Sequence, residues 1–159
     1  MSVSLRLYRA SDLPILQDWY NNIDAFSYAT GNHSLAVSLP KFVSDNPGIR
    51  MICVDDGKVI GIIVASQKEL LREKILWITL LMVDEKEQRK GYGTVALDRL
   101  YGLCGYGTLI KKVLVAVDPE NKRGLAFWTA KGYQIMNNQW CKDMGLMKEV
   151  VILQLGPGL

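Results

Sequence analysis

Residues 88–94, Gln-Arg-Lys-Gly-Tyr-Gly-Thr, form the stretch of this sequence best suited to bind an anion. They follow a long apolar run, 75–83, and precede an amphipathic run, 95–103. A strand, a glycine-containing basic turn and a helix in this order direct backbone N–H groups and the positive end of the helix dipole towards one point. Gly91 and Gly93 also let the backbone approach a ligand that a side chain would block. The stretch therefore predicts a site for a phosphate or a pyrophosphate.

Three known motifs compete for this turn. A Walker A loop requires a lysine directly after its second glycine, and that lysine is missing here. Residues 91–96 match the Gly-x-Gly-x-x-Ala turn of dinucleotide-binding domains, with Asp118 as the candidate ribose-binding acid. However, the polar run 84–90 separates this turn from its strand, and the spacing to Asp118 is long for that motif. A nicotinamide-dinucleotide-binding oxidoreductase domain thus stays one alternative.

The third motif, [Gln/Arg]-x-x-Gly-x-[Gly/Ala], is met by Gln88, Gly91 and Gly93. A second block follows, made of Asn121 and residues 124–133, Gly-Leu-Ala-Phe-Trp-Thr-Ala-Lys-Gly-Tyr. Together the two blocks resemble the acetyl-CoA-binding segments of the GNAT superfamily of N-acetyltransferases.

The resemblance spans residues 75–133 and implies an α/β (α+β) fold. A GNAT-type mixed central sheet of about six to seven strands, with a splayed parallel pair, would be flanked by about four helices. The periodicity of apolar residues predicts elements that agree with this fold. Strands are expected at 4–9, 51–54, 59–66, 76–83, 112–117, 133–136 and 147–154, and helices at 12–22, 40–45, 91–105 and 121–131. We expect all of them to belong to a single acetyltransferase domain, 1–159.

Composition narrows the class of protein. A chain of 159 residues with 49% apolar and 22% charged residues is typical of a soluble globular domain. Its net charge of +3 is too small to indicate nucleic-acid binding. Cys53, Cys104 and Cys141 have neither the spacing of a metal site nor that of a disulfide framework, and no signal peptide or membrane-spanning run is evident. We therefore expect a cytoplasmic protein with reduced thiols, no metal and no membrane partner.

For the cosubstrate, acetyl-CoA, the resemblance implies contacts along one strand, one turn and one helix. Two parallel strands, 75–83 and 112–117, would separate in mid-sheet, and the pantetheine arm would pair with the freed backbone of residues 81–83. The backbone N–H of Leu81 would also bind the thioester oxygen as it becomes an oxyanion. The full set of implied cofactor-binding residues is Leu81, Met82, Val83, Gln88, Arg89, Lys90, Gly91, Tyr92, Gly93, Thr94, Asn121 and Trp128.

The usual catalytic side chains of the family are replaced in this sequence. The tyrosine that acts as an acid falls on Trp128, whose indole has no proton to give at a useful pH. The glutamate bases of ribosomal-protein and histone acetyltransferases fall on Ala116 and close to Trp77. The base therefore lies elsewhere, or water relays the proton, or the amine arrives neutral. The candidate bases are Asp24, Glu73 and Asp118.

The acceptor side is expected in the loop that contains residues 24–38. Asp24, Tyr28 and His33 combine a carboxylate, an aromatic ring and an imidazole, which suit a cationic amine. We expect a small-molecule amine as the acceptor, with a protein amine as the alternative, and the resemblance is compatible with a homodimer. The replaced tyrosine and glutamates keep a second class of function open, a non-catalytic acyl-CoA-binding module.

Overall fold

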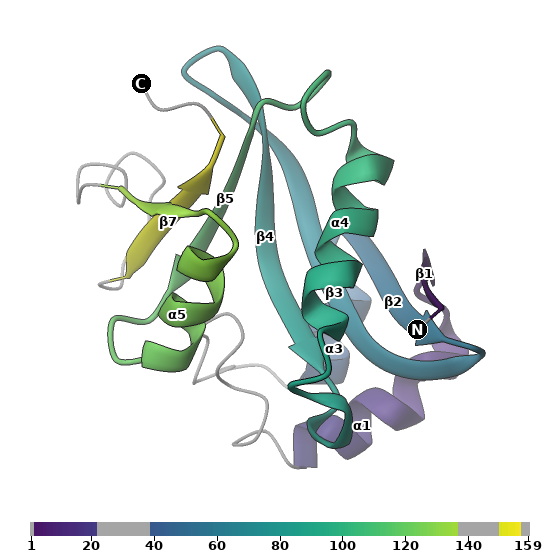
Figure 1. The fold of residues 1–159 in the computed structure, drawn as a ribbon. Helices are drawn as coiled ribbons and strands as arrows, with labels where there is room; N and C mark the ends of the chain where they lie inside the picture. Colours follow the sequence, from purple (N-terminus) through teal and green to yellow (C-terminus); the bar gives the residue numbers. More distant parts are fainter. Residues whose placement is uncertain (1, 22–38, 137–149, 157–159) are drawn as a thin grey trace.

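The computed structural model describes residues 2–21, 39–136 and 150–156. They form a seven-stranded sheet with the order β1-β2-β3-β4-β5-β7-β6 (Figure 1). Its strands are β1 (Val3–Leu7), β2 (Ile49–Asp55), β3 (Lys58–Leu70), β4 (Glu73–Val83), β5 (Lys112–Val117), β6 (Gln134–Ile135) and β7 (Val151–Leu155). The helices are α1 (Leu13–Asn21), α3 (Leu39–Asp45), α4 (Tyr92–Cys104) and α5 (Lys122–Ala130), with short 3-10 turns η1 (Ala10–Asp12) and η2 (Glu85–Glu87). Among these strands, β4 and β5 run parallel and all other neighbours run antiparallel.

Two tight hairpins build the N-terminal half of the sheet. Asp56 and Gly57 join β2 to β3 with positive φ angles of 49° and 83°, as the turn signal in the sequence predicts. Leu71 and Arg72 join β3 to β4, also with positive φ angles, 52° and 67°. Neither residue is a glycine or an asparagine, so local sequence does not indicate this second turn. The long pairing of β3 with β4 imposes it.

The parallel strands β4 and β5 pair only over their first halves. Their register ends at Ile78 and Val115, whereas β4 continues to Val83. Directly after this point Thr79 is an extra residue in β4, because consecutive residues of β3 pair with Ile78 and Leu80. Such a bulge bends a strand and increases its local twist. β4 therefore diverges from β5 towards its carboxyl end, as Figure 1 shows.

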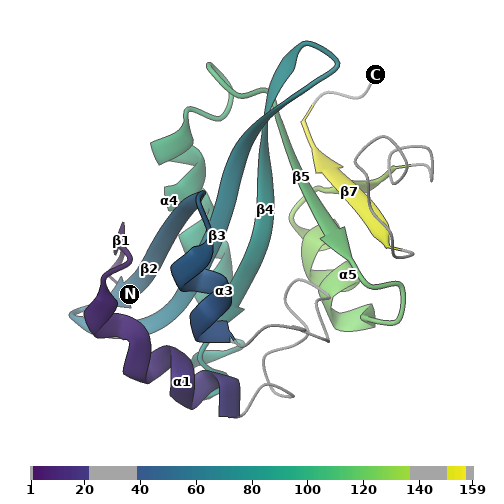
Figure 2. The same cartoon turned by 180° about the vertical axis from the view of Figure 1, so that it is seen from behind.

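The sheet separates two apolar cores. Helices α4 and α5 cover one face, and α1 and α3 cover the other (Figures 1 and 2). The bulge shifts the alternation of β4, so Ile78 and Leu81 both face the α4–α5 core, while Leu80 and Met82 face the α1–α3 core. Burying such a side chain contributes roughly 1.5–3 kcal/mol. Packing on both faces therefore holds the bulge in place.

The structure confirms the predicted fold class. A seven-stranded mixed sheet, a parallel pair that diverges, and four α-helices within the described ranges match the expectation. The first helix begins at Leu13, directly after the expected cap residues Ser11 and Asp12, and Asp12 is the last residue of the turn η1. Its carboxylate accepts hydrogen bonds from the Arg6 guanidinium and from the backbone N–H of Arg9. The Asp12 carboxylate therefore caps the turn η1, which leads into α1.

Three structural findings concern membranes, metals and thiols. No helix in residues 2–21, 39–136 and 150–156 is long and apolar enough to cross a membrane, and no group of His, Cys, Asp or Glu there could hold a metal ion. Cys53 is buried and Cys104 half-buried, both as free thiols, and Cys141 lies outside the described residues. Burial raises the pKa of Cys53 to about 12. Its thiol is therefore an inert core group at neutral pH.

Candidate functional site

A cavity of about 370 Å³ opens where β4 ends, between the N-terminus of α4 and the helix α5. This volume lies in the range of small-molecule sites. The end of β4 and the turn into α4 form one wall, and α5 forms the other. The structure brings together eight of the predicted cofactor-binding residues around this cavity: Leu81, Val83, Gln88, Arg89, Gly91, Tyr92, Gly93 and Thr94.

The turn from β4 into α4 has the backbone geometry of an anion cradle. Arg89 and Gly91 have positive φ angles, 66° and 85°, and α4 begins directly after Gly91. The first N–H groups of a helix have no carbonyl partner within it, and the helix dipole adds positive potential there. The side-chain Nε2 of Gln88 donates a hydrogen bond to the carbonyl oxygen of Val83, 2.9 Å away. Gln88 thus ties the cradle to the end of β4.

The opposite wall contains residues that were not predicted from the sequence. Arg123, Phe127 and Lys131 line the cavity from α5. A Cβ atom placed on Gly93 would lie 3.3 Å from the Phe127 ring, so the two walls approach closely at this glycine. The Lys131 ammonium lies over the same ring, 5.6 Å from its centre. The spacing of these three side chains, four residues apart, places them on one helix face, which is a signal that the sequence contains.

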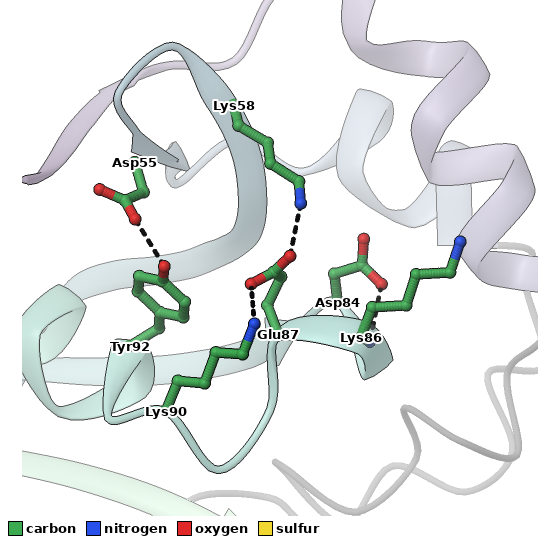
Figure 3. Close-up of polar contacts among 7 residues, drawn as sticks. All are labelled: Asp55, Lys58, Asp84, Lys86, Glu87, Lys90 and Tyr92. Atoms are coloured by element: carbon green, nitrogen blue, oxygen red, sulfur yellow. Dashed lines mark hydrogen bonds and ion pairs between the residues drawn. The ribbon is translucent and has the colours of Figure 1, made fainter. Parts of the chain in front are cut away.

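Four side chains connect the cradle to the turn between β2 and β3 (Figure 3). The hydroxyl of Tyr92 donates a hydrogen bond to the Asp55 carboxylate, 2.5 Å away. The Glu87 carboxylate, which is almost fully buried, pairs with the ammonium groups of Lys58 and Lys90. These two ion pairs, first that with Lys58, lower the pKa of Glu87. Glu87 therefore stays ionised at neutral pH beside the cavity.

The Tyr92–Asp55 hydrogen bond predicts a definite dependence of stability on pH. This bond is the main cause that lowers the pKa of Asp55, and it raises that of Tyr92 to about 12. The contribution of this hydrogen bond to the stability of the fold is thus fully present from about pH 4 to about pH 10. It is lost as pH falls through the lowered pKa of Asp55. We expect Tyr92→Phe to lower Tm by a constant amount from about pH 5 to about pH 9, and by less below about pH 4.

Thermal unfolding of wild type and Tyr92→Phe across this pH range measures the effect. Asp55→Asn is the matched control, because an amide oxygen accepts the hydrogen bond without a charge. Its Tm should not depend on the titration of this carboxyl. A difference between wild type and Tyr92→Phe that persists unchanged in strong acid would contradict the assignment of Asp55 as the ionised partner.

Two predicted cofactor-binding residues of the strand and turn lie beside the cavity without lining it. Met82 points into the α1–α3 core, because side chains alternate along β4 and both Leu81 and Val83 face the cavity. The Lys90 ammonium is 2.9 Å from the Glu87 carboxylate. A backbone contact of Met82 with a ligand stays a prediction, and so does a charge contact of Lys90.

The two predicted residues of the second block are integral to the protein interior. Asn121 is buried and caps α5, since its side-chain Oδ1 accepts a hydrogen bond from the backbone N–H of Gly124, 2.9 Å away. Trp128 is fully buried and packs edge-on against the rings of Phe127 and Tyr133. Neither side chain lines the cavity. The ring of the neighbouring Phe127, which was not predicted, lines the cavity in place of the Trp128 indole.

The three candidate bases fall in different places. Glu73 stands at the start of β4, eight residues from Leu81, which is roughly 26 Å along the strand. Glu73 thus lies at the opposite end of β4 from the cavity, and its carboxylate pairs with the Lys112 ammonium, 2.7 Å away. Asp118 is half-buried and directly follows β5 at the diverging end, where its side chain accepts a hydrogen bond from the backbone N–H of Glu120. Asp24 lies outside the described residues, as do the predicted acceptor residues Tyr28 and His33.

The positions of the two family glutamates are occupied by apolar packing. Trp77 belongs to a buried cluster with Ile75, Leu114 and Ile152, and Ala116 packs against the same cluster. These positions therefore supply no carboxylate, as the sequence indicated.

Comparison with known proteins agrees with this geometry. The family model described as Acetyltransferase (GNAT) family matches residues 14–133. No curated protein matches this sequence. An acetyltransferase from Thermus thermophilus is similar in structure, with a TM-score of 0.73 and 15% identity over 99% of this chain and 98% of that chain.

Two further structures contain bound ligands. AAC(6')-Ib in complex with ribostamycin and coenzyme A has a TM-score of 0.71 and 17% identity over 98% of this chain and 94% of that one. Naa50 of Arabidopsis thaliana, in complex with the bisubstrate analogue CoA-Ac-MVNAL, has a TM-score of 0.62 and 16% identity over 99% and 100% of the two chains. At such identities the likeness concerns the fold.

The alternative of a nicotinamide-dinucleotide-binding domain is wrong. That fold requires a mostly parallel sheet with its glycine turn at the end of the strand. Here one neighbouring pair of the described strands is parallel, and the 3-10 turn η2 separates β4 from Gly91. The family model matches more than half of the chain, and the fold and the cradle agree with it, so the chain belongs to the acetyltransferase (GNAT) family.

Proposed function

We propose that this chain transfers an acetyl group from acetyl-CoA to a primary amine, by direct attack of the neutral amine on the thioester. The observation that carries the proposal is one continuous cavity, which joins the anion cradle at the N-terminus of α4 to the diverging end of β4. Pyrophosphate suits the cradle, and an extended amide chain suits the edge of a strand that has left its neighbour. The whole chain would form a single acetyltransferase domain.

The backbone of β4 would hold the reacting part of acetyl-CoA. Beyond Ile78 the register with β5 has ended, and Leu81 and Val83 line the cavity from this segment. We assign the backbone N–H of Leu81 to the thioester oxygen, which becomes negative as the amine attacks. Removing such a donor typically raises a barrier by roughly 3–4 kcal/mol. Because a backbone group would bind the oxyanion, the Leu81 side chain can pack in the hydrophobic core.

Proton transfer would rely on Asp118, Asp24 or water. The amine must lose a proton to attack, and the CoA thiolate gains one as it leaves. Asp118 follows β5 at the diverging end of the sheet, so it is the candidate base among the described residues. No hydroxyl stands at Trp128 to act as the acid. Water or an incoming substrate group would then supply the proton to the thiolate.

A small-molecule amine is the acceptor class that we propose, bound by Asp24, Tyr28 and His33. These residues combine one carboxylate with aromatic groups, which attract a cationic amine. The structurally similar AAC(6')-Ib holds ribostamycin, whereas Naa50 holds a peptide-based analogue. A protein amine is therefore the second arm of the test.

We also propose that the protein is located in the cytoplasm.

Calorimetric titration and thiol release test the proposal in two steps. Acetyl-CoA, CoA and NAD are titrated first, and binding of the two CoA compounds with no binding of NAD is expected. CoA release is then followed with a panel that contains ribostamycin, a polyamine, amino acids and a short peptide. Binding without release for any amine favours the second candidate, a non-catalytic acyl-CoA-binding module. The buried indole at the position of the family tyrosine is the observation in favour of that candidate.

The substitution Asp24→Asn tests the acceptor side separately. It should raise KM for a cationic amine and leave KM for acetyl-CoA unchanged, because only attraction to the acceptor is lost. Steady-state kinetics with both substrates varied measures this split. A fall in kcat alone, with loss of the acidic limb of its pH profile, would instead identify Asp24 as the base.

A further inference from the structure

The turn between β2 and β3 contacts the anion cradle on both of its sides. Asp55, the last residue of β2, accepts a hydrogen bond from Tyr92, which follows the cradle loop. Lys58, the first residue of β3, pairs with Glu87, which precedes that loop. Figure 3 shows both contacts reaching across from the turn to the cradle. Residues far away in the sequence thus hold the two ends of the loop 88–91.

Glu87 places a negative charge beside the anion cradle, and Lys58 helps to neutralise it. Glu87 lines the cavity with an exposure of only 6%, and a negative charge at this residue repels phosphate groups. One carboxylate oxygen contacts Lys58, and the other contacts Lys90 at 2.9 Å. Two ammonium groups around one carboxylate leave a net charge of about +1. The arrangement turns two flexible lysines into a positive cluster of defined shape.

We propose that Lys58 is a positioning residue of the acetyl-CoA site, which acts through Glu87 and Lys90 to keep the cradle positive. The proposal rests on the proposed function, because the ligand that senses this charge is the pyrophosphate of acetyl-CoA. It adds to the site a residue that lies outside both sequence motifs, on a hairpin that precedes them. Lys58 itself does not line the cavity, so its effect passes through the Glu87 carboxylate.

The first test is Lys58→Met, with binding of acetyl-CoA measured by calorimetry. Glu87 then keeps Lys90 alone, and the net charge of the cluster falls from about +1 to about zero. We expect Kd for acetyl-CoA to rise about tenfold at low salt and by less at high salt, because added ions screen the charge. The rise in KM for acetyl-CoA should exceed any change in kcat. Lys58→Arg should restore most of the affinity.

The second test is a charge rescue. In the Lys58→Met background, Glu87→Gln removes the carboxylate that has lost one of its two lysine partners. The cluster of this double variant again has a net charge of about +1, from Lys90 alone, so we expect it to bind acetyl-CoA within about threefold of wild type. A role of Lys58 in folding alone would not produce such a rescue. Thermal unfolding of each variant checks that the chain remains folded.

Lys86→Met is the matched control. Lys86 carries the same charge in the neighbouring turn η2, and its ammonium points away from Glu87 (Figure 3). We expect its Kd to change by at most about twofold. Equal weakening by Lys86→Met, unchanged binding by Lys58→Met, or failure of Glu87→Gln to rescue each overturns the role of Lys58 alone. A wild-type chain that does not bind acetyl-CoA overturns this role and the proposed function together.

Discussion

Replacing Gly93 with valine is expected to abolish measurable binding of acetyl-CoA while the chain stays folded. A Cβ atom at this position already approaches the Phe127 ring at 3.3 Å, and the two methyl groups of valine would extend into the cavity that both residues line. The loss of several hydrogen bonds to charged phosphates, each worth roughly 1.5–3 kcal/mol, weakens binding by more than about 100-fold. Stability should fall little, because valine forms helix better than glycine.

Gly91→Val should give the same loss of binding for a different reason. No atom lies within 4 Å of a Cβ placed on Gly91, so space is not the obstacle. Its φ of 85° is the obstacle, because left-handed backbone disfavours side chains by roughly 1–2 kcal/mol and valine is β-branched. The substitution would turn the cradle N–H groups away from the anion.

Gly102→Val is the control for both glycine variants. Gly102 lies on the same helix, exposed, with open space around its Cβ position. Calorimetric titration with acetyl-CoA and thermal unfolding should show normal binding and a stable fold for this variant. If Gly91→Val and Gly93→Val also bind normally, the cradle lies elsewhere in the chain.

The substitution Trp128→Ala is expected to destabilise the protein by roughly 3–5 kcal/mol. The indole is fully buried, and its ring centre lies 4.9 Å from that of Tyr133 and 5.1 Å from that of Phe127. Removing the indole leaves a large cavity beneath α5, and the closely packed core around it can fill that cavity only in part. Urea denaturation of wild type and variant measures the difference in the free energy of unfolding.

Trp128→Phe separates packing from catalysis at the same position. It should cost less stability than Trp128→Ala and leave kcat within a small factor of wild type, because the indole has no proton to give. Steady-state kinetics on the folded variant supplies this measurement. A fall of about 1,000-fold in kcat with unchanged stability would show an essential indole N–H, since general acid–base groups contribute roughly 100- to 10,000-fold.

The elements that could be predicted are those set by residues close together in the sequence. The helix 91–105 is observed as α4, and Gly105 ends it in left-handed backbone. The strand 112–117 is observed with the same bounds, and the turn before Lys58 follows its Asp-Gly signal. The cradle motif also depends on glycines that lie close together in the sequence. These features were predictable because neighbouring residues decide them.

Long-range pairing decided the features that the sequence did not indicate. The bulge at Thr79 and the left-handed turn at Leu71 arise from the register of β3 with β4. The burial of Trp128 and the outward position of Phe127 depend on how α5 rotates against the sheet. A resemblance to a family shows which positions correspond, but it does not show which side chains of α5 face the sheet and which face the cavity. The residues that line the cavity from the α5 side were therefore not predicted.

The two motif blocks were enough to indicate the family by resemblance. Hydrophobic periodicity predicted the strands and helices, and the glycines at 91 and 93 predicted the turn before α4, because both signals act within a few residues. The side chains that meet at the site, by contrast, are brought together by long-range packing. That packing joins Lys58 to Glu87 across 29 residues, and it buries Trp128 while Phe127 lines the cavity. Such contacts depend on strand order and register, which are set by the packing of the whole sheet.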